Sequence, residues 1–237
     1  ATYPFENQKL SHSWVDGYMK SYKEAKLKDV RNETLESYIK KYNNDEQSFF
    51  SWYEDFDKTS DLRIKAGDFD HVYWVDALGI EWMSLIQHFV EENPSKMRIE
   101  HAYIAATGLP TSTQHNSKDC DTKISDLDEM VHGEYYQKYH TLAKQITLIG
   151  EIVDDLCRQK ADRRILIISD HGLTALSRLY QPKKYEKKAS HEGRYILLDK
   201  PCEVADNDYL RYHSDATDFI IALKHNSLNN KPAREVH

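Results

Sequence analysis

The chain has 237 residues, a formal net charge of −7 and three cysteines. The length is enough for one large α/β domain with a small helical unit. Cys120, Cys157 and Cys202 fit neither a disulfide framework nor a CxxC zinc site, so we expect a reducing, cytoplasmic compartment. The net negative charge argues against a surface that binds nucleic acid throughout, although a local basic groove is compatible with it. Without an 18-residue apolar run or a leader pattern, we expect no membrane contact.

The first quarter of the chain is rich in aromatic residues at helical spacing. Trp14, Tyr18 and Tyr22 recur every four residues, and a similar pattern continues to residue 57. This pattern predicts a few short amphipathic helices whose aromatic face packs into a core. A charged connector, residues 58–67, follows. We therefore expect a helical N-terminal subdomain over residues 1–67.

From residue 68 onward, strand patterns alternate with helical ones. Branched aliphatic residues at 165–168 predict a central strand buried on both faces, and Gly172 permits a sharp turn after it. The alternation predicts an α/β fold with a mostly parallel sheet sandwiched by helices. In chain order we expect a strand at 71–75, a helix at 79–90, a strand at 97–106, a polar loop at 107–120, a helical turn at 125–132, a long helix at 134–160, and strands at 165–168, 195–198 and 219–223.

Polar residues follow several of these strands. Asp76 ends the first strand, Thr111 and Thr113 lie in the loop after the second, and Asp170 with His171 ends the third. Because the carboxyl ends of parallel strands meet at one edge of a sheet, these side chains are expected to converge. Two carboxylates, an imidazole and a hydroxyl are suitable ligands for Zn²⁺, Mn²⁺ or a similar ion.

A second group of candidate ligands is Asp128 and His132. Their i, i+4 spacing places both on one face of a helical turn, as two ligands of one metal ion require. The same spacing is common in surface pairs, so the pair by itself is weak. His237, the last residue, is the candidate third ligand.

Four short motifs, in this order, resemble the PglZ domain: VYWVDALG, LPTST, DLDEMVH and ISDHGL. That domain belongs to the alkaline-phosphatase superfamily and occurs in phage-defence systems of the BREX type and in some response regulators. The resemblance covers about residues 70–237, so we expect a PglZ domain over residues 68–237. The family continues beyond the point where this sequence stops, so we expect a domain truncated at its C-terminus and a chain that is part of a longer protein.

The resemblance implies a metal-dependent phosphatase or phosphodiesterase that acts on a nucleotide or nucleic-acid phosphoester, together with other defence-system proteins. It implies two bound divalent metal ions, with zinc as the first choice and manganese or magnesium as the alternatives. Thr113 would be the nucleophile, with Thr111 as the alternative. The implied ligands are Asp76, Thr113, Asp170 and His171 for one ion and Asp128, His132 and His237 for the other.

Several residues near these motifs are weaker candidates. His115, Asn116 and Lys118 either contact substrate phosphate or are solvated loop residues. His191 and Arg194, in the loop after Asp-His-Gly, either bind substrate, support the metal ligands from behind or have no role in the site. A non-catalytic scaffold domain is the alternative function. A phosphomutase or sulfatase-like reaction is a third, although the Pro-Thr-Ser-Thr loop lacks the cysteine typical of a sulfatase nucleophile.

Overall fold

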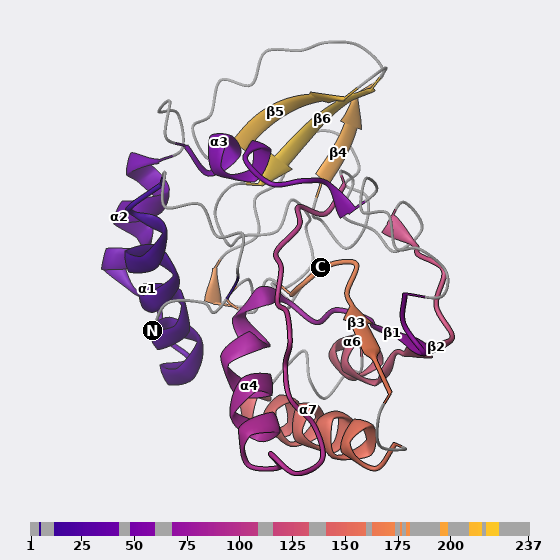
Figure 1. Ribbon diagram of the computed structural model, residues 1–237. Coiled ribbons are helices and arrows are strands. Elements are labelled where there is room, and N and C mark those ends of the chain that lie inside the picture. The colour runs from indigo at the N-terminus through magenta and orange to yellow at the C-terminus, as the bar shows by residue number, and fades with distance from the viewer. Residues whose placement is uncertain are drawn as a thin grey trace. The chain divides into compact units, whose positions relative to one another are not determined.

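The contacts of the chain divide it into two units, residues 1–11 with 56–172 and residues 12–55 with 173–237. This division differs from the expected division into residues 1–67 and 68–237. The expected domain boundary stays a prediction. None of the described helices is long and apolar enough to cross a membrane. The computed structural model describes residues 5, 12–42, 48–59, 68–108, 116–132, 141–159, 163–173, 176, 179–180, 195–198, 209–214 and 217–222 (Figure 1).

The first unit contains a three-stranded parallel sheet. Strand β1 (His71–Val75) is central, with β2 (Thr122–Ile124) on one side and β3 (Ile165–Ile168) on the other. Tyr73 is in register with Thr122 on β2 and with Ile167 on β3. Because all three strands run in the same direction, their carboxyl ends reach one edge of the sheet.

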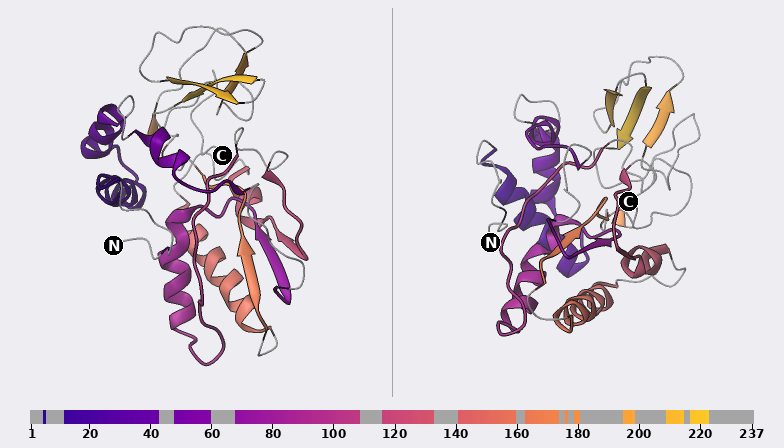
Figure 2. Two further views of the ribbon diagram at one scale, coloured as in Figure 1. Left: turned by 45° about the horizontal axis from the view of Figure 1, so that its top comes forward. Right: turned by 45° about the vertical axis from the view of Figure 1, so that its right-hand side comes forward.

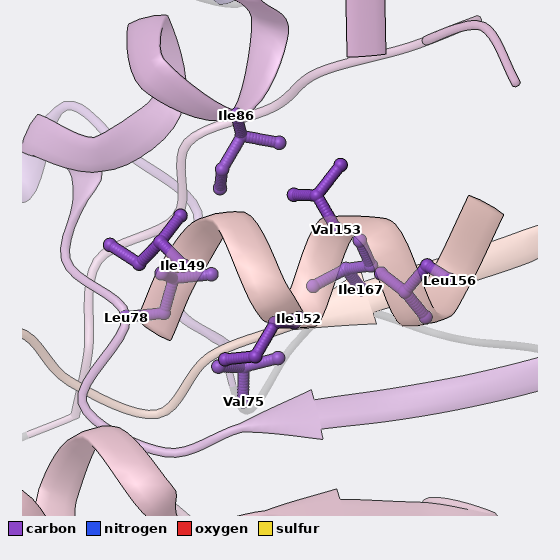
Figure 3. A pocket seen from close by; sticks show the side chains of 8 residues that line it. All are labelled: Val75, Leu78, Ile86, Ile149, Ile152, Val153, Leu156 and Ile167. Carbon is purple, nitrogen blue, oxygen red and sulfur yellow. The ribbon is translucent and has the colours of Figure 1, made fainter. Parts of the chain in front are cut away.

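Two helices, α4 (Met83–Glu91) and α7 (Leu142–Cys157), pack against each other and cover one face of this sheet (Figure 2). A short 3₁₀ turn, η2 (Ile80–Trp82), leads into α4, and α6 (Asp126–His132) follows β2. Figure 3 shows apolar side chains of β1, β3, α4 and α7, together with one from the segment after β1, meeting around a small cavity. They are Val75, Leu78, Ile86, Ile149, Ile152, Val153, Leu156 and Ile167.

The helices of the second unit are α1 (Val15–Lys28), α2 (Glu33–Lys41) and α3 (Phe49–Glu54), as the aromatic spacing predicted. Trp14 is 4% exposed, and its ring lies 4.6 Å from the rings of both Tyr42 and Phe49. Asn32 and Ser48 accept hydrogen bonds from the first turns of α2 and α3, which satisfies backbone donors there. The aromatic face therefore packs within this unit.

The later strands of the second unit form a separate antiparallel sheet. Its order is β4 (Tyr195–Leu198), β6 (Thr217–Ala222) and β5 (Tyr209–Ser214). The strands expected at 195–198 and near 219–223 are thus present as β4 and β6, but they pair antiparallel with each other, and β6 also with β5, and they do not belong to the parallel sheet. What the structure shows is a mixed α/β protein with a small parallel sheet flanked by helices.

The strand expected at 97–106 is wrong. Residues 97–105 form no strand, and Ala106 makes only an isolated bridge to Lys58. The charged Arg98 and Glu100 are exposed and pair with each other at 2.8 Å, so this segment lacks a second apolar face. The partner of β1 is instead β2, a three-residue strand with a lysine at its centre, which no apolar pattern marks.

Two further expectations are corrected. Helix α7 begins at Leu142, because Thr141 has non-helical backbone angles (φ −114°, ψ 13°) and a continuous helix from 134 to 160 cannot pass through it. The expected residues 134–140 lie outside the described part of the chain. Among the described strands β3 is at the edge of its sheet, and its four residues are only half-buried.

The packing in Figure 3 predicts the effect of truncating a core side chain. Ile149 is 1% exposed, so Ile149→Ala should lower the free energy of unfolding by about 2–4 kcal/mol through lost burial and a new cavity. Urea unfolding followed by circular dichroism measures this change. Glu151→Ala on the exposed face of α7 is the control, with an expected change within about 0.5 kcal/mol. Equal effects of the two variants would contradict the placement of α7.

Candidate metal centre

Asp76 is placed by the end of β1. Its backbone N–H donates to the carbonyl oxygen of Ile124 (2.9 Å), which extends the β1–β2 pairing by one bond. The next residue, Ala77, is fully buried in the left-handed region (φ 63°), which costs a residue with a Cβ about 1 kcal/mol. The chain therefore turns sharply after Asp76 and keeps this carboxylate at the sheet edge, only 3% exposed.

Asp170 and His171 are placed by the turn after β3. Ser169 donates its hydroxyl to the His171 carbonyl oxygen (3.0 Å) within this turn. A Cβ on Gly172 would lie 2.9 Å from the Cα of Gly79, closer than side-chain atoms approach a backbone. Glycine is thus required at position 172 because the loops after β1 and β3 touch there. This close packing is a second reason for the glycine, besides the turn expected from the sequence.

The structure brings Asp76, Asp170 and His171 together as a buried group whose ligand atoms lie within 4.8 Å of one another. The Nε2 atom of His171 is 3.4 Å from Oδ1 of Asp76 and 3.5 Å from Oδ2 of Asp170. Ligand atoms at 2.0–2.2 Å from a tetrahedral zinc ion lie roughly 3.3–3.6 Å apart. The distances from Nε2 to the two carboxylate oxygens therefore suit one metal ion held by the three side chains.

The details of each side chain agree with this fit. Nδ1 of His171 lies 3.3 Å from the carbonyl oxygen of Gly172, and an oxygen that only accepts requires the proton on Nδ1. Nε2 then faces the two carboxylates as a ligand atom, the usual arrangement of a metal-bound histidine. Oδ1 of Asp76 is buried and accepts no hydrogen bond from the described part of the chain, an arrangement that a cation would satisfy. The group could hold a metal ion.

Lys123 is a site residue that the sequence analysis missed. Its Nζ atom lies 2.6 Å from Oδ2 of Asp76 and 4.7 Å from the centre of the Trp74 ring. Burial disfavours the ammonium, but the hydrogen bond and charge of Asp76, helped by Asp170 and Asp128, outweigh it and raise the pKa of Lys123. Only the position of Lys123 on a strand next to β1 could have identified it, and the sequence pattern does not reveal that this segment is a strand.

Asp128 and His132 lie on α6, as expected, with Nε2 of His132 3.4 Å from Oδ2 of Asp128. Burial raises the pKa of Asp128, and the negative charges of Asp76 and then Asp170 raise it further. His132 and His171 act in the opposite direction, but the net shift is upward. Asp128 is therefore close enough to the buried group for their charges to interact. The role of this pair as ligands of a second metal stays a prediction.

The remaining candidates are only partly described. Asn116 is buried and makes two hydrogen bonds to the backbone of Gly108. Its Oδ1 accepts from the Gly108 N–H (2.8 Å), and its Nδ2 donates to the Gly108 carbonyl oxygen (3.1 Å). Lys118 is half-buried in the loop before β2. Candidates that lie outside the described residues are Thr111, Thr113, His115, His191, Arg194 and His237.

The donor geometry predicts that metal binding depends on His171. His171→Ala should lower zinc affinity by at least about tenfold, because it removes one of three converging ligand atoms. Isothermal titration with zinc on the full chain measures the affinity. His88→Ala, which removes an exposed histidine on α4, should bind zinc as the original chain does. Equal affinity in the two variants would instead favour His171 as an ordinary buried ion-pair partner.

Compared with known proteins, the chain matches no family model, no curated protein and no solved structure. The candidate site is therefore inferred from the geometry of the chain itself. Asp76, Asp170 and His171 form a buried group at the carboxyl edge of a parallel sheet.

Proposed function

We propose that the chain is a metal-dependent phosphoester hydrolase of the PglZ type, with an alkaline-phosphatase-like fold. The observation that carries the proposal is the buried group of Asp76, Asp170 and His171, whose donor atoms are spaced as metal ligands. Support also comes from the order of the four PglZ-like motifs, of which two contain these three residues. The small parallel sheet is compatible with such a fold.

Asp76, Asp170 and His171 would hold the first ion. A bound divalent ion supplies positive charge that lowers the pKa of a hydroxyl and stabilises phosphoryl oxygens. The two carboxylates balance one dication, so Lys123 beside Asp76 leaves local positive charge for an anionic substrate. Positive charge next to a reacting phosphoryl group is the main protein contribution to phosphoryl transfer.

Thr113 is the proposed nucleophile, on the strength of its place in the Pro-Thr-Ser-Thr motif. Its hydroxyl oxygen would attack phosphorus and lose its proton, while the bond to the leaving oxygen breaks and that oxygen takes up a proton. Water would then hydrolyse the phosphothreonine ester and release the phosphate product. Thr111 is the alternative nucleophile.

Asp128 and His132, with His237, are the proposed ligands of a second ion, and zinc is proposed for both positions. Support comes from Asp128, whose pKa responds to the charges of Asp76 and Asp170. Two ions near one another can stabilise the attacking and leaving oxygens of a displacement. A nucleotide or nucleic-acid substrate, a cytoplasmic location and other phage-defence proteins as partners complete the proposal.

A non-catalytic scaffold is the second candidate, and the Lys123–Asp76 ion pair favours it. The ammonium supplies positive charge to the buried carboxylates without a metal ion. Metal analysis separates the two candidates, because a scaffold of this kind predicts less than one bound zinc per chain after zinc loading. The hydrolase predicts at least one.

The nucleophile assignment predicts a specific loss of activity. The zinc-loaded chain should hydrolyse p-nitrophenyl phosphoesters, and Thr113→Ala should lower the rate at least about 100-fold because no group then attacks phosphorus. The release of p-nitrophenol, followed by absorbance, measures the rate. Ser112→Ala is the matched control, since it removes the neighbouring hydroxyl and should retain most of the activity. Activity that survives Thr113→Ala but not Thr111→Ala would move the assignment to Thr111.

A further inference from the structure

Lys123 and the candidate metal position use different oxygens of Asp76. The ammonium lies 2.6 Å from Oδ2, whereas Oδ1 faces Nε2 of His171 at 3.4 Å. A metal ion between Oδ1 and His171 would therefore leave the ammonium in place. Any effect of Lys123 on metal binding is then electrostatic and not a direct steric block.

The sign of that effect follows from the charges. In the metal-free chain the negative charges of two buried carboxylates, Asp76 at 2.6 Å and Asp170, act on the ammonium, and the charge of the half-buried Asp128 adds to them. A bound dication cancels the charges of the two buried carboxylates and itself repels the ammonium. Lys123 thus stabilises the metal-free state more than the metal-loaded state.

The structure also shows how Lys123 is kept at this position. Its ammonium lies over the Trp74 ring at 4.7 Å, on the neighbouring strand and in register with it. Its side chain is 38% exposed, whereas that of Asp76 is 4% exposed. The ammonium can therefore return to water without moving the carboxylate, which is what a weak, reversible counter-ion requires.

We propose that Lys123 is the built-in counter-ion of the candidate metal centre, which holds Asp76 in the metal-free protein and thereby weakens metal binding. This inference rests on the metal centre of the proposed function. Because coupling between two binding events is reciprocal, metal binding weakens the hold of Lys123 on Asp76 by the same factor. Lys123 then acts as a positioning residue that sets how readily the site takes up and releases its ion.

Zinc titration of the full chain and of Lys123→Met tests the counter-ion. We expect the dissociation constant for zinc to fall about 5- to 150-fold in Lys123→Met, the usual range for coupling between two sites. The melting temperature of the metal-free variant should fall by about 4 °C or more, because a buried carboxylate loses its partner, and zinc should restore much of that loss. Lys123→Arg, which keeps the charge, and Lys96→Met, which removes an exposed lysine from the same unit, should behave as the original chain does.

The outcomes separate this inference from the proposed function. Zinc binding that is unchanged or weaker in Lys123→Met, while the original chain binds zinc, overturns the counter-ion alone. Zinc binding by neither protein overturns it together with the metal centre. If Lys123→Met folds only when refolded with zinc, the counter-ion is supported; if zinc does not rescue its folding while the original chain folds, the counter-ion is wrong.

Discussion

Two buried carboxylates held close together are the constraint on which the first unit depends. The ligand atoms of Asp76 and Asp170 lie within 4.8 Å of each other. Two like charges at that separation repel by roughly 3.5 kcal/mol at an effective dielectric constant of 20, and burial removes the water that would screen them. Asp76 and Asp170 are nevertheless 3% and 2% exposed. They are tolerated because the Lys123 ammonium lies against one oxygen of Asp76 and, in our proposal, a metal ion lies between the carboxylates and Nε2 of His171.

The parallel sheet is what brings these charges together. Asp76 and Asp170 follow neighbouring strands that end at the same edge, and Lys123 on β2 pairs with Asp76 there. The helices α4 and α7 cover an apolar face of the same sheet, and the described side chains that line the cavity there are all apolar. Apolar packing therefore fixes the strands, and the strands fix the distances between the charged groups. A chain that lost this packing would also lose the site.

The sequence predicted the parts of the site that local patterns encode. His71–Val75 and Ile165–Ile168 are apolar runs that end in Asp76 and Asp170, so their strands and the convergence of those ends could be read directly. Strand β2 could not be read, because three residues with a central lysine carry no apolar periodicity. The order β2-β1-β3 depends on long-range pairing between segments about 50 and 90 residues apart, which no local pattern encodes. Lys123 was missed for the same reason.

The contact between Gly172 and Gly79 has a consequence for how this site can vary. The two loops meet backbone to backbone, so the spacing between the ends of β1 and β3 is set by main-chain atoms and not by adjustable side chains. A larger residue at Gly172 would force a shift between the two loops that follow Asp76 and His171, even with every ligand retained. We expect that an insertion in either loop would have to be matched by a change in the other. The two motifs that end in these loops would then vary as a single unit, although they lie far apart in the chain.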